Sequence, residues 1–215
     1  MRLVIISDMH GGYSFSIPKG DVLIFAGDIT RYGSRKEVKY FCDYMKYLPH
    51  TYKIVVAGNH DRCFQRHWDR IPEFFDYSAG FTYLEDDQFT TVDGIKFYGS
   101  PWQPEFQDWS FNLPRGEALK QKWDMIPEDI NVLITHGPPA GILDQSRGIS
   151  VGCSDLYDAV RRIKPRYHIF GHIHSAHGVS CPYGDTTFIN ASLCDERNKV
   201  ARVPIVVDYG IPVFR

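Results

Sequence analysis

Side chains that could bind metal ions recur at five places in the sequence, each at the end of a short apolar run. The segments are residues 3–11, 21–30, 52–61, 131–139 and 167–174, and each breaks at Gly, Ser or Thr before Asp, Asn or His follows. Alone, each polar group is ordinary turn or cap chemistry. Their recurrence after all five runs indicates one shared site, formed by Asp8, His10, Asp28, Asn59, His60, His136, His172 and His174.

The five runs read as buried β-strands. They are rich in β-branched residues, and their apolar character is continuous rather than alternating, which is typical of strands covered on both faces. The predicted fold class is therefore α/β. In such sheets the loops at the carboxyl ends of the strands converge on one crevice, so the polar clusters are expected to meet there.

Helices between the strands are predicted from caps and apolar periodicity. Residues 34–49 open with a capping box of Ser34 and Glu37, and residues 153–165 open with Ser154 as the predicted N-cap. A third helix is predicted over about residues 116–124. The apolar faces of the first two consist of Val38, Phe41, Met45 and Leu48, and of Leu156, Val160 and Ile163.

The remaining chain predicts further β-structure within one domain, residues 1–215. Residues 89–99 read as a hairpin that turns at Asp93 and Gly94, and residues 186–192 and 201–210 read as further strands. Neither a repeat nor a linker divides the sequence. The length suffices for a sizeable core.

The donor types point to a pair of divalent cations. Carboxylate, amide oxygen and imidazole without thiolate favour Mn²⁺, Fe²⁺ or Zn²⁺, and the donors exceed what one ion needs. The cysteines contribute little to this chemistry, because they are five in number and form no CxxC pair. Free thiols of this kind suit a reducing cytoplasm, which is the predicted location.

Composition excludes several other classes. The formal net charge of -2 argues against stable nucleic-acid binding through general electrostatics. No apolar stretch approaches the roughly 20 residues that span a bilayer. The four apolar residues after Arg2, residues 3–6, are too few for a signal-peptide core, so we expect the folded domain to begin at Met1.

The ordered motifs resemble the calcineurin-like metallophosphoesterases. These motifs are DxH at 8–10, GD at 27–28, GNHD at 58–61, a His followed by Gly-Pro at 136–138 and GHxH at 171–174. The segments "PWQPEF", "LITHGPPAGILD" and "INAS" further resemble the small single-domain metallophosphoesterase-domain-containing subgroup, which is similar to class III cyclic-nucleotide phosphodiesterases. The resemblance implies a layered β-sandwich of two mixed sheets flanked by helices, with a binuclear metal centre.

Carried over residue by residue, the resemblance assigns roles at the centre. It implies that one ion is held by Asp8, His10 and His174 and the other by Asn59, His136 and His172, with Asp28 as the bridge. Mn²⁺ is the predicted metal, with Fe or Zn²⁺ as alternatives. His60 would donate a proton to the leaving oxygen or stabilise phosphoryl charge, and Asp61 would orient its imidazole and raise its pKa.

The implied activity is hydrolysis of small phosphodiesters, cyclic nucleotides among them, by a hydroxide that bridges the metals. A phosphomonoesterase and a catalytically weak metal-containing scaffold are the alternatives. Arg31, Arg62 and Arg147 are either phosphate partners or surface charges. Similarly, the aromatic cluster Trp102, Phe106, Trp109 and Phe111 either stacks on substrate or packs in the core.

Overall fold

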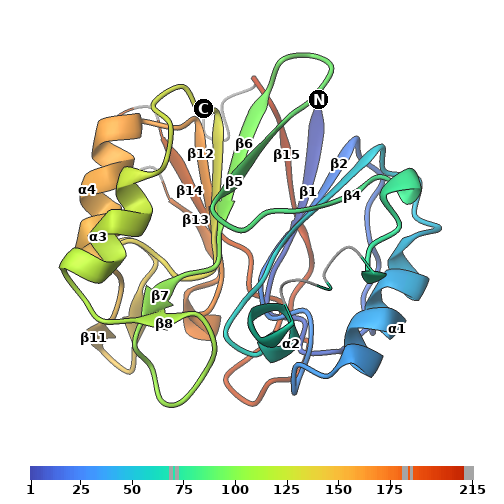
Figure 1. The fold of residues 1–215 in the computed structure, drawn as a ribbon, viewed down its shortest axis with the longest axis horizontal. Helices are drawn as coiled ribbons and strands as arrows, with labels where there is room; N and C mark the ends of the chain where they lie inside the picture. Colours follow the sequence, from blue (N-terminus) through green and yellow to red (C-terminus); the bar gives the residue numbers. More distant parts are fainter. Residues whose placement is uncertain (68–69, 71–72, 181–183, 185, 211–215) are drawn as a thin grey trace.

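The apolar runs form the inner strands of two β-sheets in the computed structural model, which describes residues 1–67, 70, 73–180, 184 and 186–210 (Figure 1). The first sheet has the order β15-β1-β2-β3-β4. Strands β1 to β4 are mutually parallel, and β15 pairs antiparallel with β1. Their bounds are β1 Arg2–Ile6, β2 Val22–Ala26, β3 Tyr52–Val56, β4 Phe81–Tyr83 and β15 Ile205–Asp208.

The second sheet has the order β13-β14-β12-β9-β6-β5. Its four inner strands are parallel, and its two edge strands are antiparallel to their neighbours. The predicted hairpin is confirmed as β5 and β6, with Gly94 at a φ of 80° in the turn. The bounds are β5 Asp87–Thr90, β6 Lys96–Ser100, β9 Val132–Thr135, β12 Tyr167–Phe170, β13 Gly178–Ser180 and β14 Thr187–Asn190.

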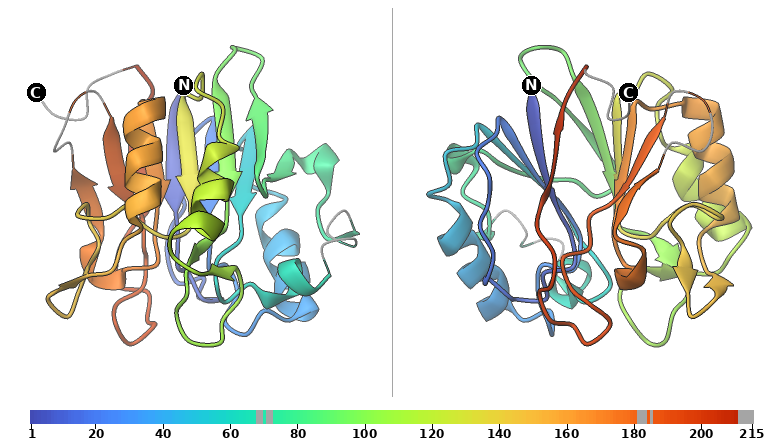
Figure 2. Two further views of the ribbon diagram at one scale, coloured as in Figure 1. Left: turned by 60° about the vertical axis from the view of Figure 1, so that its left-hand side comes forward. Right: turned by 180° about the vertical axis from the view of Figure 1, so that it is seen from behind.

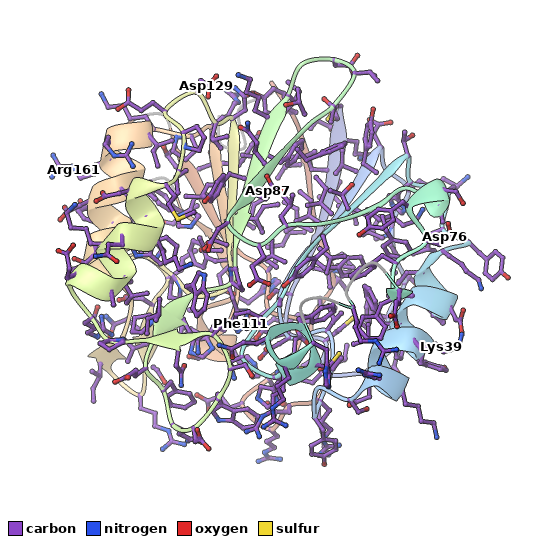
Figure 3. All side chains as sticks on the ribbon, in the orientation of Figure 1. Lys39, Asp76, Asp87, Phe111, Asp129 and Arg161 are labelled. Atoms are coloured by element: carbon purple, nitrogen blue, oxygen red, sulfur yellow. The ribbon has the colours of Figure 1, made fainter. Side chains whose placement is uncertain are left out.

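Helices cover the outer faces of both sheets (Figure 1). Helix α1 (Arg35–Met45) covers the first sheet, while α3 (Glu117–Asp124) and α4 (Ser154–Ile163) cover the second. Lys39 of α1 and Arg161 of α4 project from opposite sides of the molecule (Figure 3). The predicted α/β class, a layered sandwich of two mixed sheets flanked by helices, is confirmed.

Alternate residues of each inner strand enter different cores. In β1, Leu3 and Ile5 face the core between the sheets, whereas Val4 and Ile6 pack toward α1. All four are fully buried. This two-sided burial is the reason for the unbroken apolar runs in the sequence.

The predicted helix caps are partly correct. In α1, Ser34 Oγ accepts a hydrogen bond from Glu37 N, and the Glu37 carboxylate accepts one from Ser34 N, as the capping box requires. In α4 the N-cap is Cys153, not Ser154, because Cys153 has the extended backbone and its Sγ accepts from Leu156 N at 3.4 Å. The C-cap of that helix is Lys164, which has a φ of 52°.

Short elements gather beyond the carboxyl ends of the parallel strands, at the lower edge of Figure 1. They are α2 (Arg62–Arg66), η3 (His174–Ala176), the parallel pair β7 (Gln103–Pro104) and β8 (Asn112–Leu113), and the hairpin β10 (Gln145–Ser146) and β11 (Ile149–Ser150). The short helix η2 (Tyr77–Ala79) lies instead at the amino end of β4. Within the described ranges, every helix is too short or too polar to cross a membrane.

One buried histidine of the sheet couples folding to pH. His168 of β12 is fully buried, and its Nε2 lies 2.9 Å from Thr135 Oγ1. Burial lowers the pKa of His168 to about 3. The folded protein therefore keeps this ring neutral where an exposed histidine would take up a proton.

We expect the unfolding free energy of the metal-free protein to decrease as the pH falls below about 6.5, the ordinary histidine pKa. The reason is that unfolded His168 gains a proton that the folded ring accepts only near pH 3. This contribution changes by up to about 1.4 kcal/mol per pH unit. Urea unfolding at about pH 7 and about pH 5 should give a smaller pH effect for His168→Gln than for the wild type. Equal pH effects in the variant and the wild type would show that His168 is not the source of the pH dependence.

Candidate metal centre

Four of the predicted ligands have a backbone conformation that is rare for residues other than glycine. They lie in loops after β1, β2 and β12, and they are Asp8 (φ 50°), His10 (φ 44°), Asp28 (φ 53°) and His172 (φ 65°). The left-handed region costs a non-glycine residue roughly 1–2 kcal/mol. Strain of this kind in a group of neighbouring polar residues is typical of functional sites.

The first donor set brings together residues that are more than 160 positions apart in the sequence. His174 Nε2 lies 3.2 Å from Asp8 Oδ1 and 3.2 Å from His10 Nε2. Asp28 Oδ2 lies 3.7 Å from His10 Nε2. This set therefore combines loops after β1, β2 and β12.

The second donor set lies on the other side of Asp28. Asn59 Oδ1 is 2.9 Å from both His136 Nε2 and His172 Nδ1. The second carboxylate oxygen of Asp28, Oδ1, is 3.5 Å from His136 Nε2. One carboxylate thus offers an oxygen to each set.

The donor atoms fit a pair of cations. Two donors that bind one ion at about 2.1 Å lie roughly 3.0–3.4 Å apart in octahedral or tetrahedral geometry, close to the separations measured here. Two glycines let the backbone pass close to the carboxylates. A side chain at Gly58 would overlap with Asp28, and one at Gly171 would overlap with Asp8. All seven predicted ligands are thereby brought together, without a thiolate among them.

Charge is concentrated at this centre. Burial raises the pKa of Asp8, but its hydrogen bond to His174 and nearby imidazoles outweigh burial and hold that pKa well below the usual value. Burial likewise opposes the charged form of His136, yet the Asp28 carboxylate raises the His136 pKa to about 9. Burial, reinforced by His136, lowers the pKa of His172 to about 4. Buried carboxylates that draw positive charge toward them in this way are suited to bound cations.

His60 lies beside the donors, and the backbone engages one of its two ring nitrogens. Its Nδ1 donates to Arg31 O at 2.8 Å, so the remaining nitrogen is Nε2. The ring is 4.5 Å from that of His10 and stacks on Trp109 at 4.0 Å. A ring nitrogen of His60 also lies within 4.8 Å of donor atoms in His10 and Asp28.

Asp61 does not orient His60, contrary to the expectation from sequence. Its buried carboxylate instead accepts hydrogen bonds from Thr30 N, Thr30 Oγ1 and Gly58 N, at 2.7–2.9 Å. Asp61 thereby joins the loop after β2 to the loop after β3. Burial and the Asp28 charge raise the Asp61 pKa to about 6, although these hydrogen bonds act in the opposite direction.

A cleft of about 480 Å³ adjoins the donors. Of the three arginines proposed as phosphate partners, Arg147 lines it, at the tip of the β10–β11 hairpin. Arg31 is exposed outside the lining. Arg62 also lies outside it, where its guanidinium sits 4.5 Å from the Trp109 ring centroid and donates to Asp108 O.

The aromatic cluster divides between the cleft and the core. Phe106 and Trp109 line the cleft, and Phe106 lies edge-on to His172 at 5.7 Å. Phe111 is fully buried in the molecular interior (Figure 3), where it packs against Trp102. The indole nitrogen of Trp102 donates to Asp86 at 2.8 Å.

Comparisons with known proteins agree with this geometry. The family model for calcineurin-like phosphoesterases matches residues 1–176. The chain belongs to the calcineurin-like phosphoesterase family. Family membership indicates a metal-dependent phosphoester hydrolase, and it confirms the resemblance found in the motifs.

Individual relatives and structures extend the similarity over nearly the whole chain. Metallophosphoesterase domain-containing protein 1 of Homo sapiens is 43% identical over 98% of this chain and 72% of its own length. A UPF0046 protein of Caenorhabditis elegans is 43% identical over 96% of this chain and 74% of its own length. Phosphopantetheinyl hydrolase of Mycobacterium tuberculosis shares the fold, with a TM-score of 0.62, 16% identity and coverage of 91% and 90% of the two chains.

Several residues at this phosphoesterase cleft were missed from the sequence. Glu105, Arg115 and Glu196 line it. Glu105 lies within the "PWQPEF" segment but was not singled out there, and no motif or spacing marks Arg115 or Glu196. Arg115 donates at 2.7 Å to the carbonyls of Val151 and Gly152, so it secures the end of the β10–β11 hairpin. Such a contact depends on tertiary placement and leaves no periodic signal.

Asp28→Ala is expected to reduce metal content more than loss of any other single donor, because Asp28 contributes one oxygen to each donor set. Elemental analysis after equilibration with Mn²⁺ measures the effect. Asp93→Ala, in the exposed turn before β6, is the matched control and should keep the wild-type metal content. Two ions retained by Asp28→Ala would disprove the bridging assignment.

Proposed function

We propose that the protein hydrolyses small phosphodiesters with a pair of divalent cations, Mn²⁺ in particular. The observation that carries this proposal is the pair of donor sets that share Asp28 and adjoin a cleft containing His60. When bound, the cations would supply an activated water and offset negative charge on the phosphoryl group. Asp8, His10 and His174 would hold one, and Asn59, His136 and His172 the other.

The shape of the cleft favours a diester over a monoester. Its volume of about 480 Å³ lies within the range of small-molecule sites, and its walls extend beyond the donors to Phe106 and Arg147. This space can accommodate organic groups on the phosphate. Arg147 would bind an anionic part of the substrate, and Phe106 and Trp109 would contact a flat apolar part, as in a cyclic nucleotide.

His60 would act as the proton donor to the leaving oxygen. Its Nδ1–H is held by Arg31 O, which leaves Nε2 as the nitrogen that can carry and deliver a proton. Stacking on Trp109 limits rotation of the ring and shields one of its faces from water. Arg31 therefore contributes through its backbone carbonyl, whatever the role of its side chain.

A substrate panel tests this proposal. The chain, freed of metal and reloaded with Mn²⁺, should hydrolyse bis(p-nitrophenyl) phosphate and cyclic nucleotides faster than p-nitrophenyl phosphate. Addition of EDTA should abolish the activity, and excess Mn²⁺ should restore it. Preference for the monoester would support a phosphomonoesterase instead. Absence of turnover with all three, despite two bound ions, would support a scaffold, and EDTA-resistant turnover would refute metal dependence.

His60→Ala is expected to lower kcat by ~10²-fold or more, since loss of a positioned acid removes a contribution of that order. Metal content should stay close to the wild type because His60 belongs to neither donor set. Steady-state kinetics and elemental analysis on the same preparation separate the two effects. A variant with wild-type kcat would exclude His60 as the proton donor.

A further inference from the structure

The segment that follows β14 joins the two sheets beside the metal centre. The chain crosses there from the second sheet to the first before β15 begins (Figure 2, right). Ala191 N donates to Phe170 O at 2.8 Å, and Ser7 N donates to Ala191 O at 3.0 Å. Leu193 N then donates to Ser7 O at 2.9 Å. Residues 191–193 therefore link the end of β12 to the end of β1.

Within this segment, Ser192 is bonded to one of the ligands. Its hydroxyl donates to Asp8 Oδ2 at 2.8 Å, and both residues are fully buried. The same oxygen accepts from His172 N at 2.9 Å and lies 2.6 Å from Ser7 Oγ, whose single proton is also within reach of Ala26 O. These donors occupy Oδ2, so Oδ1 is the oxygen left to face His174.

Asn190 holds a second ligand through the backbone. Its Nδ2 donates to Ile173 O at 3.0 Å and lies 3.4 Å from Gly171 O. These two carbonyls flank His172, whose φ of 65° needs external support. The side-chain oxygen of Asn190 accepts from Ser192 N at 3.1 Å, which fixes the orientation of its amide.

Asp195 completes the segment with a contact to a third ligand. Its backbone carbonyl accepts a hydrogen bond from His174 Nδ1 at 2.8 Å. This bond requires the proton of neutral His174 to reside on Nδ1, so the lone pair of Nε2 is available to a cation held next to Asp8. The three contacts of the segment thus reach Asp8, His172 and His174, which come from different sheets.

We propose that residues 190–195 are the positioning element that sets the distance and orientation between the two halves of the metal centre. The proposal rests on the two-cation centre of the proposed function, and it assigns a role to the "INAS" residues outside the matched family region. The first sheet supplies Asp8 and the second supplies both histidines, so their geometry depends on what joins the sheets. Substitution of residues that hydrogen-bond to metal ligands typically lowers metal affinity by about 10–100-fold.

Ser192→Ala is the sharpest test. Loss of the hydroxyl should lower the affinity of the Asp8, His10 and His174 set for its ion by about 10-fold or more. The affinity of the other set should stay unchanged. Calorimetric titration with Mn²⁺ in the absence of substrate should then show one weakened site. Electron paramagnetic resonance at one to two equivalents of Mn²⁺ should show fewer spin-coupled pairs than in the wild type.

The matched control is Thr186→Val. Thr186 is buried just before the opposite end of β14, and its hydroxyl donates to Pro165 O at 2.7 Å. Both variants lose one buried hydroxyl, so both should lower the melting temperature of the metal-free protein. Only Ser192→Ala should also reduce the increase in melting temperature caused by Mn²⁺.

Asn190→Asp provides a second test that preserves side-chain volume. A carboxylate cannot donate to the carbonyls of Gly171 and Ile173, so the backbone around His172 loses its support. The affinity of the Asn59, His136 and His172 set for its ion should therefore fall by about 10-fold or more. Wild-type affinity of both ions in both variants would overturn the positioning role. A wild-type chain that binds fewer than two ions would instead refute the proposed function on which it rests.

Discussion

The site depends on the burial of two carboxylates among imidazoles at the junction of two sheets. Asp8 and Asp28 are nearly or fully buried, where negative charge is unfavourable unless positive charge is close by. Protonated imidazoles can provide part of that charge, and two cations would provide more. Four of the ligands have a strained backbone conformation, which costs conformational free energy but directs their side chains toward a common centre.

The sandwich supplies different donors from its two layers. Loops of the first sheet provide both carboxylates, the Asn59 amide and His10, whereas loops of the second provide His136, His172 and His174. The apolar core between the sheets therefore keeps the two groups of ligands close together, and residues 190–195 connect them directly. A packed interior resists small displacements, so the fold can hold donor atoms at the separations that a bound ion requires.

Loops outside this rigid frame form the rest of the cleft. The segment that carries Phe106 and Trp109, and the hairpin that carries Arg147, are attached to the frame by side-chain contacts such as that of Arg115. Such loops can vary while the strand ends stay constant. Within the calcineurin-like phosphoesterase family, the choice of substrate by this chain would accordingly reside in these segments rather than in the donors.

The sequence by itself determined the inner strands, the start of α1 and the seven candidate donors. Those features depend on short-range patterns, such as the unbroken apolar run at 3–6 and the capping box at Ser34. Tertiary structure decided the rest. Asp61 bonds Thr30 instead of His60, Arg62 stacks on Trp109 instead of reaching the cleft, and Ser192 meets Asp8 across the molecule. Residue type and spacing carry no record of these contacts, because each joins segments that are distant in the sequence and meet only in the folded chain.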